Sequence, residues 1–234
     1  MNIEERDTLF DEYEDNIKES EERKIIFTNC GFVNLQANIN QGFCLNNSTL
    51  GFDFLNTRIG RVINIHSLEL NGWAYSNLGA DLQKSGSGAN TTMVSACMLR
   101  LLIFIDYQTN GAPVANTKLY QQGNPAFMNP VNFSLESRIK VIHDEAWTFG
   151  PCWINEAGNV VAFGDKQSHI IRVCKKFDPP LRTVYNNNNV QNATAIQTGG
   201  LFAYWSSSCV APMLGGDNRE ISGNFQCVVR FTDD

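Results

Sequence analysis

From residue 25 onward, apolar residues recur at every second position or in short continuous runs. Such patterns indicate β-strands, because an amphipathic helix needs apolar residues three and four positions apart. Eight segments have this character, and turns or long loops rich in Gly, Asn, Pro and Ser separate them. The eight predicted strands are residues 24–39 (with a possible break at Gly31), 60–75, 96–108, 137–149, 169–177, 181–185, 199–208 and 224–232.

No stretch after residue 25 shows a convincing helical period of ten residues. Parallel neighbouring strands need crossover connections of a dozen or more residues, usually helical, so a parallel sheet is excluded. Eight antiparallel strands with long connections fit a double-sheet jelly roll. We therefore predict an all-β, eight-stranded antiparallel jelly roll of two facing four-stranded sheets. Residues 25–234 form this single domain, and residues 1–24 precede it as a short acidic segment.

The charge of the chain is concentrated in that segment. Residues 1–24 hold ten acidic and four basic residues, whereas the remaining residues hold 14 of each, so the formal charge of −6 belongs to the segment. Leu9, Phe10, Tyr13 and Ile17 stand near helical spacing, which is compatible with a short amphipathic helix. A solvated arm is the favoured alternative. No apolar run approaches the ~20 residues that span a bilayer, and no signal-peptide core precedes the strands, so we expect no membrane contact.

Seven cysteines are scattered along the chain without a C-x-x-C pair or histidines at zinc-ligand spacing. We expect reduced thiols rather than disulfides or a metal site. Cys97, Cys174 and Cys227 stand inside apolar strand patterns and are predicted to be core residues. No cofactor is expected.

The segment RLLIFIDYQTNG (residues 100–111) has two interpretations. An apolar strand ending in aspartate can hold magnesium beside a nucleotide phosphate, but the chain has no Gly-rich phosphate loop with its lysine. Asn110-Gly111 is a strong turn signal, so Asp106 is predicted to lie where a central strand leaves the sheet. Arg100 within this strand needs a partner, which is either another group of the chain, a second chain or nucleic acid. The core is predicted to include Leu101, Ile103, Ile105, Val141, Val228 and Phe231.

Catalytic patterns are weak. His143 is followed by Asp144 and Glu145, but adjacent strand residues point to opposite faces of a sheet. The motifs of serine hydrolases, zinc proteases and EF-hands are missing from the sequence. A pair of carboxylates assembled in space for glycoside hydrolysis stays open. The prediction is that the chain is not an enzyme.

Four segments in order carry a resemblance to a known family. They are RIGRVINIHSLELNG (58–72), RLLIFIDYQTNGAP (100–113), NFSLESRIKVIHDEAW (132–147) and GNFQCVVRFTD (223–233). The order and spacing of the four segments match that family across residues 25–234. The chain resembles the single jelly-roll coat proteins of circular, Rep-encoding single-stranded DNA viruses, which are similar in turn to the satellite tobacco necrosis virus coat protein.

The resemblance implies self-assembly into a small icosahedral virion shell, with T=1 symmetry and 60 copies, around a single-stranded genome, made in the host cell and without catalysis. It implies subunit or nucleic-acid contacts by Arg58, Arg61 and Arg138, to which Arg100 is added, and a loop shaped by Asp106, Asn110 and Gly111. The long connections 76–95, 109–136 and 207–223 are expected at intersubunit contacts and on the outer surface.

The sequence departs from that family in one respect. Its members begin with an Arg/Lys-rich arm that neutralises packaged phosphates, and here the arm is acidic. Either a basic arm is missing, or inward loops package the genome, or assembly proceeds without tight genome binding. The second functional hypothesis is a jelly-roll carbohydrate-binding module, in which Trp73, Trp147, Trp153 or Trp205 would stack on sugar rings.

Overall fold

The computed structural model describes residues 23–35, 41–78, 92–94, 96–112, 114–120, 129–150, 152–154, 160–163, 167–186, 193–208 and 219–234. Most of residues 1–24 therefore lie outside the described residues. The first sheet consists of β1 (Lys24–Asn29), β2 (Phe32–Leu35), β6 (Val62–Leu78), β12 (Ser168–Tyr185), β13 (Ile196–Thr198) and β15 (Arg219–Asp233). The second sheet consists of β3 (Gln41–Cys44), β8 (Cys97–Asp106), β9 (Ile139–Phe149) and β14 (Gly200–Ser207).

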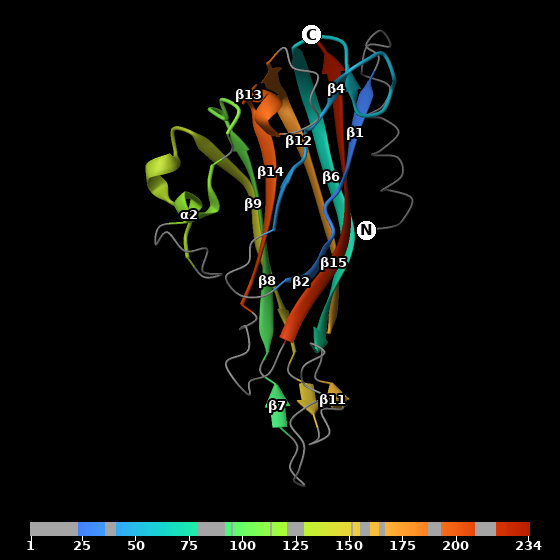
Figure 1. Ribbon diagram of the computed structural model, residues 1–234, viewed down its shortest axis with the longest axis vertical. Helices are drawn as coiled ribbons and strands as arrows, with labels where there is room; N and C mark the ends of the chain where they lie inside the picture. Colours follow the sequence, from blue (N-terminus) through green and yellow to red (C-terminus); the bar gives the residue numbers. More distant parts are fainter. Residues whose placement is uncertain are drawn as a thin grey trace, which may run out of the picture.

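The order of the strands defines the fold. The first sheet runs β1-β15-β6-β12-β13, with β2 also on β15, and the second runs β3-β14-β8-β9. All of these pairings are antiparallel. If β1 and β2 count as one interrupted strand, the eight main strands are divided equally between two facing sheets in the double Greek-key order of a jelly roll (Figure 1). The predicted fold class is confirmed.

Two of the predicted strands are joined in the structure, and β3 is the one main strand that was not predicted. Segments 169–177 and 181–185 belong to the single strand β12, which continues past Asp178, Pro179 and Pro180 with a register shift against β6. The shift lets the strand pass two prolines that cannot donate to the ladder. The short strand β3 lacks an alternating pattern long enough to be recognised. The expected break at Gly31 is confirmed, since it separates β1 from β2.

The main core fills the space between the two sheets. It includes Leu99, Leu101, Ile103 and Ile105 of β8, and facing residues such as Phe225 and Phe231 of β15. The alternate residues of β8, Leu102 and Phe104, are also fully buried, but in a second cluster on the outer side of the sheet. The connection after β8, which contains the helix α2 (Asn116–Leu119) and the 3-10 turn η2 (Phe133–Leu135), supplies that second cluster. This cover explains why β8 is apolar on both faces.

The burial predictions are partly wrong. Leu101, Ile103, Ile105 and Phe231 are buried. Val141 is 38% exposed because it lies on β9, the last strand of its sheet. Val228 is only partly buried, since its neighbours Cys227 and Val229 take the inward positions of β15 and period-2 alternation turns Val228 outward.

The cysteine prediction is corrected at one position. Cys30, Cys97 and Cys227 are buried free thiols, whereas Cys174 is exposed and also free. Cys174 follows the buried Val173 on β12 and therefore points to the opposite, outer face. Burial raises the pKa of the Cys30 thiol to about 12 and that of the partly buried Cys44 thiol to about 12.

Small elements complete the domain. β7 (Thr92–Val94), β10 (Cys152–Ile154) and β11 (Val160–Phe163) form a three-stranded sheet at the end opposite the C-terminus (Figure 1). β4 (Thr49–Leu50) and β5 (Thr57–Arg58) form a short parallel pair, and the turn η3 (Ala193–Ala195) leads into β13. The short strands β4, β5, β7, β10, β11 and β13 were not predicted either. Among the described residues, no helix has the length and apolar character needed to cross a membrane.

Candidate subunit interface

Six large apolar side chains are exposed along β1 and the connection between β3 and β6. We name this set the apolar patch. Phe52 is 87% exposed, and Phe54 and Ile59 are each 53% exposed. The full patch consists of Phe27, Leu50, Phe52, Phe54, Leu55 and Ile59. Large exposed apolar patches mark association sites in soluble proteins.

Hydrogen bonds fix the apolar patch against the edge of the first sheet. The Ile25 amide donates to the Phe54 carbonyl at 3.2 Å, and the Asn56 amide donates to the Ile25 carbonyl at 2.8 Å. The Asn56 side chain accepts a hydrogen bond from the Phe27 amide at 2.6 Å. Asn56 adopts a positive φ of 58°, a conformation that asparagine tolerates better than most residues. The connection therefore covers the edge of β1 and presents its aromatic side chains on a fixed backbone.

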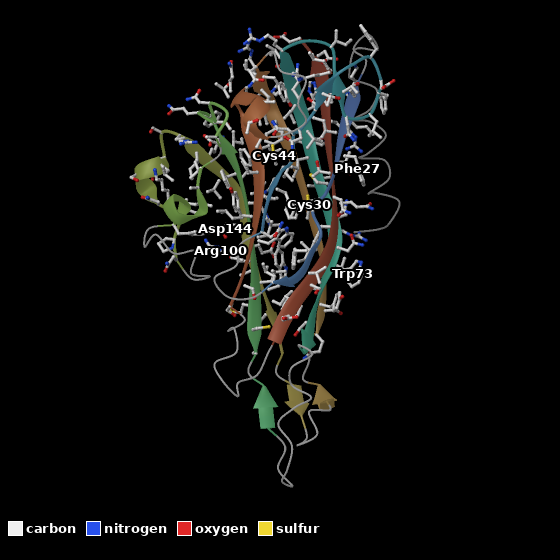
Figure 2. The ribbon with its side chains drawn as sticks, in the orientation of Figure 1. Phe27, Cys30, Cys44, Trp73, Arg100 and Asp144 are labelled. Atoms are coloured by element: carbon white, nitrogen blue, oxygen red, sulfur yellow. The ribbon has the colours of Figure 1, made fainter. Side chains whose placement is uncertain are left out.

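A second exposed surface lies on the outer face of the first sheet. Trp73 is 48% exposed and stacks on Tyr75, with ring centroids 5.0 Å apart. Its cross-strand neighbour Ile170 is 77% exposed. Figure 2 shows Trp73 on the side of the sheet that faces away from the core. Both rings border a hollow of about 600 Å³ that Asn29, Ser222 and Asn224 also line.

Trp205 and Trp147 are less accessible to a ligand than Trp73. Trp205 is fully buried, and Trp147 packs against the main core. The side chain of Trp153 lies outside the described residues. Trp73 is therefore the tryptophan of the described residues that is placed to stack on a ligand.

Arg58 and Arg61 lie at the end of the sandwich that carries the C-terminus. Arg58 is fully buried, its guanidinium lies 4.2 Å from the centre of the Tyr185 ring, and it donates to the Gly60 carbonyl. Burial lowers the pKa of the Arg58 guanidinium. Arg61 is exposed and donates to the Tyr185 carbonyl at 3.2 Å. In the single chain, Arg61 is thus the more accessible of the two.

Arg100 finds its partner within the chain. Its Nε and Nη2 donate to the two carboxylate oxygens of Asp144 at 2.7 and 2.6 Å, and Nη1 donates to the Asn129 carbonyl at 2.8 Å. The bonds to Asp144 raise the pKa of Arg100. Both side chains lie on the outer side of the second sheet (Figure 2). The pair binds the long connection after β8 to the sheet.

Asp106 and Arg138 form a second two-bond pair. Arg138 Nε and Nη2 donate to the Asp106 carboxylate at 2.9 and 2.7 Å, and Nη2 also donates to the Ala112 carbonyl at 3.0 Å. These bonds raise the pKa of Arg138. Asp106 is the last residue of β8, where the central strand leaves the sheet, as expected for this position.

Asn110 and Gly111 form the predicted turn. Their φ angles are 46° and 76°, which explains the Asn-Gly sequence. The turn does not close a hairpin with β9, however. The amides of Asn110 and Gly111 donate to the Gln197 and Ile196 carbonyls on β13, at 2.8 and 2.9 Å. The turn therefore joins the connection after β8 to the opposite sheet.

A basic groove between β9 and β12 was not predicted from the sequence. It has a volume of about 620 Å³, and its lining includes Ile105, Ile142, Phe177 and Leu181 among the apolar residues. The cations Lys140, Lys175, Lys176 and Arg182 and the single carboxylate of Asp178 give the lining a net formal charge of +3. The run KKFDPPLR (175–182) was a sequence signal for it, but Lys140 joins only in three dimensions.

Within the described ranges, no three His, Cys, Asp or Glu side chains come together in a way that holds a metal ion. His143 lies 3.4 Å from Glu145, two residues along the same strand, and Asp144 turns to Arg100 instead. The adjacent side chains thus diverge, as expected for a strand. Of the predicted contact loops, residues 79–91, 121–128 and 209–218 lie outside the described residues.

Comparisons with known proteins find similarity among solved structures alone. No family model matches the sequence, and no curated protein matches it. Among solved structures, the chain is similar to a chain of the T13 IBDV viral particle, with 9% identity, a TM-score of 0.26 and coverage of 91% of this chain and 36% of that chain. It thus spans about a third of that protein.

Polyomavirus VP1 proteins are also similar at this low level. The VP1 of trichodysplasia spinulosa-associated polyomavirus has 9% identity and a TM-score of 0.27, with coverage of 93% and 96% of the two chains. The VP1 of New Jersey polyomavirus has 7% identity and a TM-score of 0.25, with coverage of 89% and 97%. The strand order of this chain, rather than these weak superpositions, establishes the jelly roll.

Proposed function

We propose that the protein is a structural coat protein that self-assembles into a closed icosahedral shell. The apolar patch on β1 and the following connection carries this proposal, because six large apolar side chains are exposed on β1 and on a connection that is hydrogen-bonded to it. Burial of apolar surface is the dominant favourable contribution to most protein–protein association. That the assembly is a closed viral shell is inferred from the jelly-roll fold together with the motif resemblance. The finer form is a T=1 shell of 60 copies around a single-stranded genome, located in the virion and produced in the host cell.

The four arginines that the sequence predicted as contact residues have different roles in this proposal. Arg61 is exposed in the single chain and is available for a subunit or nucleic-acid contact. Arg100 and Arg138 act through the loops that their ion pairs hold in place. Arg58 would support an interface from within, because it is a fully buried residue of the same connection that carries most of the apolar patch.

Particle size tests the proposal. Purified protein, examined by light scattering and negative-stain microscopy across salt and pH, is expected to form hollow symmetric particles of megadalton mass. Phe52→Asp should shift the population to small species. Val33→Asp is the matched control, since Val33 is 79% exposed but lies outside the apolar patch. Monomers under every condition, with no particles, would overturn the proposal.

A carbohydrate-binding module is the second candidate, and one observation favours it. Trp73 and Tyr75 form an exposed aromatic platform beside a hollow lined by amide and hydroxyl groups. Aromatic faces stack on sugar rings, and Asn and Ser side chains bond hydroxyl groups. If the protein stays monomeric and loses glycan binding on Trp73→Ala, this second function replaces the first.

A further inference from the structure

The basic groove has a charge that the rest of the domain does not have. Its lining carries a net +3, whereas residues 25–234 are neutral overall. Lys140 projects from β9, and Lys175, Lys176 and Arg182 come from β12. Four cations around an apolar floor form a surface suited to an acidic ligand that also carries apolar side chains.

Protection of strand edges accounts for the lysines of the groove but not for its apolar floor. Among the described strands, β9 pairs only with β8, and over Ser168–Lys176 β12 pairs only with β6. Charged residues on such edges, lysine above all, prevent pairing with other chains. Such protection does not require the apolar side chains of Ile142, Phe177 and Leu181 between the cations.

The N-terminal segment of this chain has the complementary composition. Residues 1–22 hold ten acidic and two basic residues, a net charge of −8. They also include Leu9, Phe10, Tyr13 and Ile17, which match the apolar floor of the groove. A polynucleotide would satisfy the cations and could stack a base on Phe177, but it has no apolar side chains to cover the aliphatic Ile142 and Leu181.

The register of the first sheet puts the groove within reach of this segment. Lys24, where β1 begins, is paired with Phe231, Phe231 with Ile65, and Ile65 with Leu181 in the groove. Three inter-strand spacings amount to about 14 Å. A chain of 22 residues can extend to roughly 70 Å, so the segment can reach the groove of its own subunit.

We propose that residues 1–22 dock in the basic groove between β9 and β12 of the same subunit. The carboxylates pair with the lysine and arginine side chains, and the apolar residues cover the floor. The open edges of the sandwich are thereby closed by the chain's own acidic segment. This docking does not require shell assembly, so it goes beyond the proposed function and can be tested on any assembly state.

Site-specific photo-crosslinking in the full chain tests the docking. Tyr13 is replaced by benzoylphenylalanine, and crosslinked peptides are identified by mass spectrometry. Crosslinks to residues 139–142 or 175–182 are expected. A mixture of ¹⁵N-labelled and unlabelled chains should give crosslinked pairs of a single label. Pairs of mixed label, or crosslinks located elsewhere, would overturn the proposal.

Reversing the charges of the groove lysines is the second test of the docking. The triple variant Lys140→Glu/Lys175→Glu/Lys176→Glu keeps charges on both strand edges and should lose the groove crosslinks. Adding Asp11→Lys, Glu12→Lys, Glu14→Lys and Asp15→Lys should restore them. Lys118→Glu, at an exposed lysine of α2, is the matched control and should leave them unchanged. If the triple variant remains folded by circular dichroism and retains the crosslinks, the charge pairing is refuted.

Discussion

Asp106 and Arg138 form an ion pair that closes the base of the long connection between β8 and β9. Asp106 ends β8 with a fully buried carboxylate, and Arg138 directly precedes β9. The Tyr107 amide also donates to the Arg138 carbonyl at 2.8 Å. Everything between these residues, including α2 and the residues that cover the outer side of β8, is thus held at both ends.

Arg138→Ala is expected to destabilise the domain by about 3 kcal/mol, because it leaves a buried carboxylate without its partner. The measurement is the free energy of unfolding in urea. Arg172→Ala, at an exposed position on β12, should stay within about 0.5 kcal/mol of the unsubstituted protein. In the double variant Asp106→Ala/Arg138→Ala the loss should be smaller than the sum of the single losses. Strict additivity would mean that the pair does not act as a unit.

Ile103→Ala should cost about 2–5 kcal/mol, because Ile103 is fully buried between the sheets and its truncation leaves a cavity. In a chain that lacks residues 2–22, Val141→Ala should cost at most about 0.5 kcal/mol, since Val141 is 38% exposed on the edge strand. Equilibrium unfolding of the two variants gives the comparison. Similar losses at both positions would show that β9 is covered in solution.

Acidification should lower the stability of the folded protein through His143. Desolvation lowers its pKa, Lys175 lowers it further, and Glu145 and Asp144 act in the opposite direction. The unfolded histidine takes up a proton as the pH falls through about 6.5, whereas the folded one resists, so the folded state loses stability below that pH. Between pH 7.5 and 5, the unsubstituted protein should therefore lose more unfolding free energy than His143→Gln. A relative gain on acidification would mean that the carboxylates dominate.

Among the cysteines whose side chains the structure describes, Cys174 should be the first to react with a thiol reagent in the native protein. Cys174 is exposed, while Cys30, Cys97 and Cys227 are buried and burial raises the pKa of Cys30 to about 12. Iodoacetamide treatment followed by peptide mass spectrometry should give rapid modification at Cys174 and protection at the three buried positions until denaturant is added. Early labelling of Cys97 or Cys227 would contradict the described core.

Deleting residues 2–22 should leave packaged nucleic acid unchanged or increased, because a segment of net charge −8 opposes contact with polyanions. The measurement is the ratio of absorbance at 260 and 280 nm for purified particles. Since residues 1–22 contain one tyrosine and no tryptophan, their removal changes the protein absorbance little. A clear fall in the ratio with intact particles would assign the segment to genome binding.

The sequence by itself determined the fold class. Alternation of apolar residues, the absence of helical periods and the Asn110-Gly111 turn signal are local properties, and they suffice to predict an all-β sandwich. They also identified β8 as a central strand, because a strand that is apolar on both faces must be covered on both. The same local reasoning predicted the correct number of main strands, eight, through two errors that cancel. It divided β12 at its prolines, and it missed β3 because that strand is too short to recognise.

The contacts between side chains from distant segments could be known only from the tertiary structure. Arg100 and Asp144 are far apart in sequence but meet across the pairing of β8 with β9, and Lys140 joins the cations of β12 only because two sheet edges lie side by side. Whether Phe52, Phe54 and Ile59 were core or surface depended on how their connection hydrogen-bonds to β1. Residue type and spacing predict which segments form strands, because strand formation depends on neighbouring residues. Ion pairs and exposed apolar area depend on contacts between distant segments, which these local patterns do not specify.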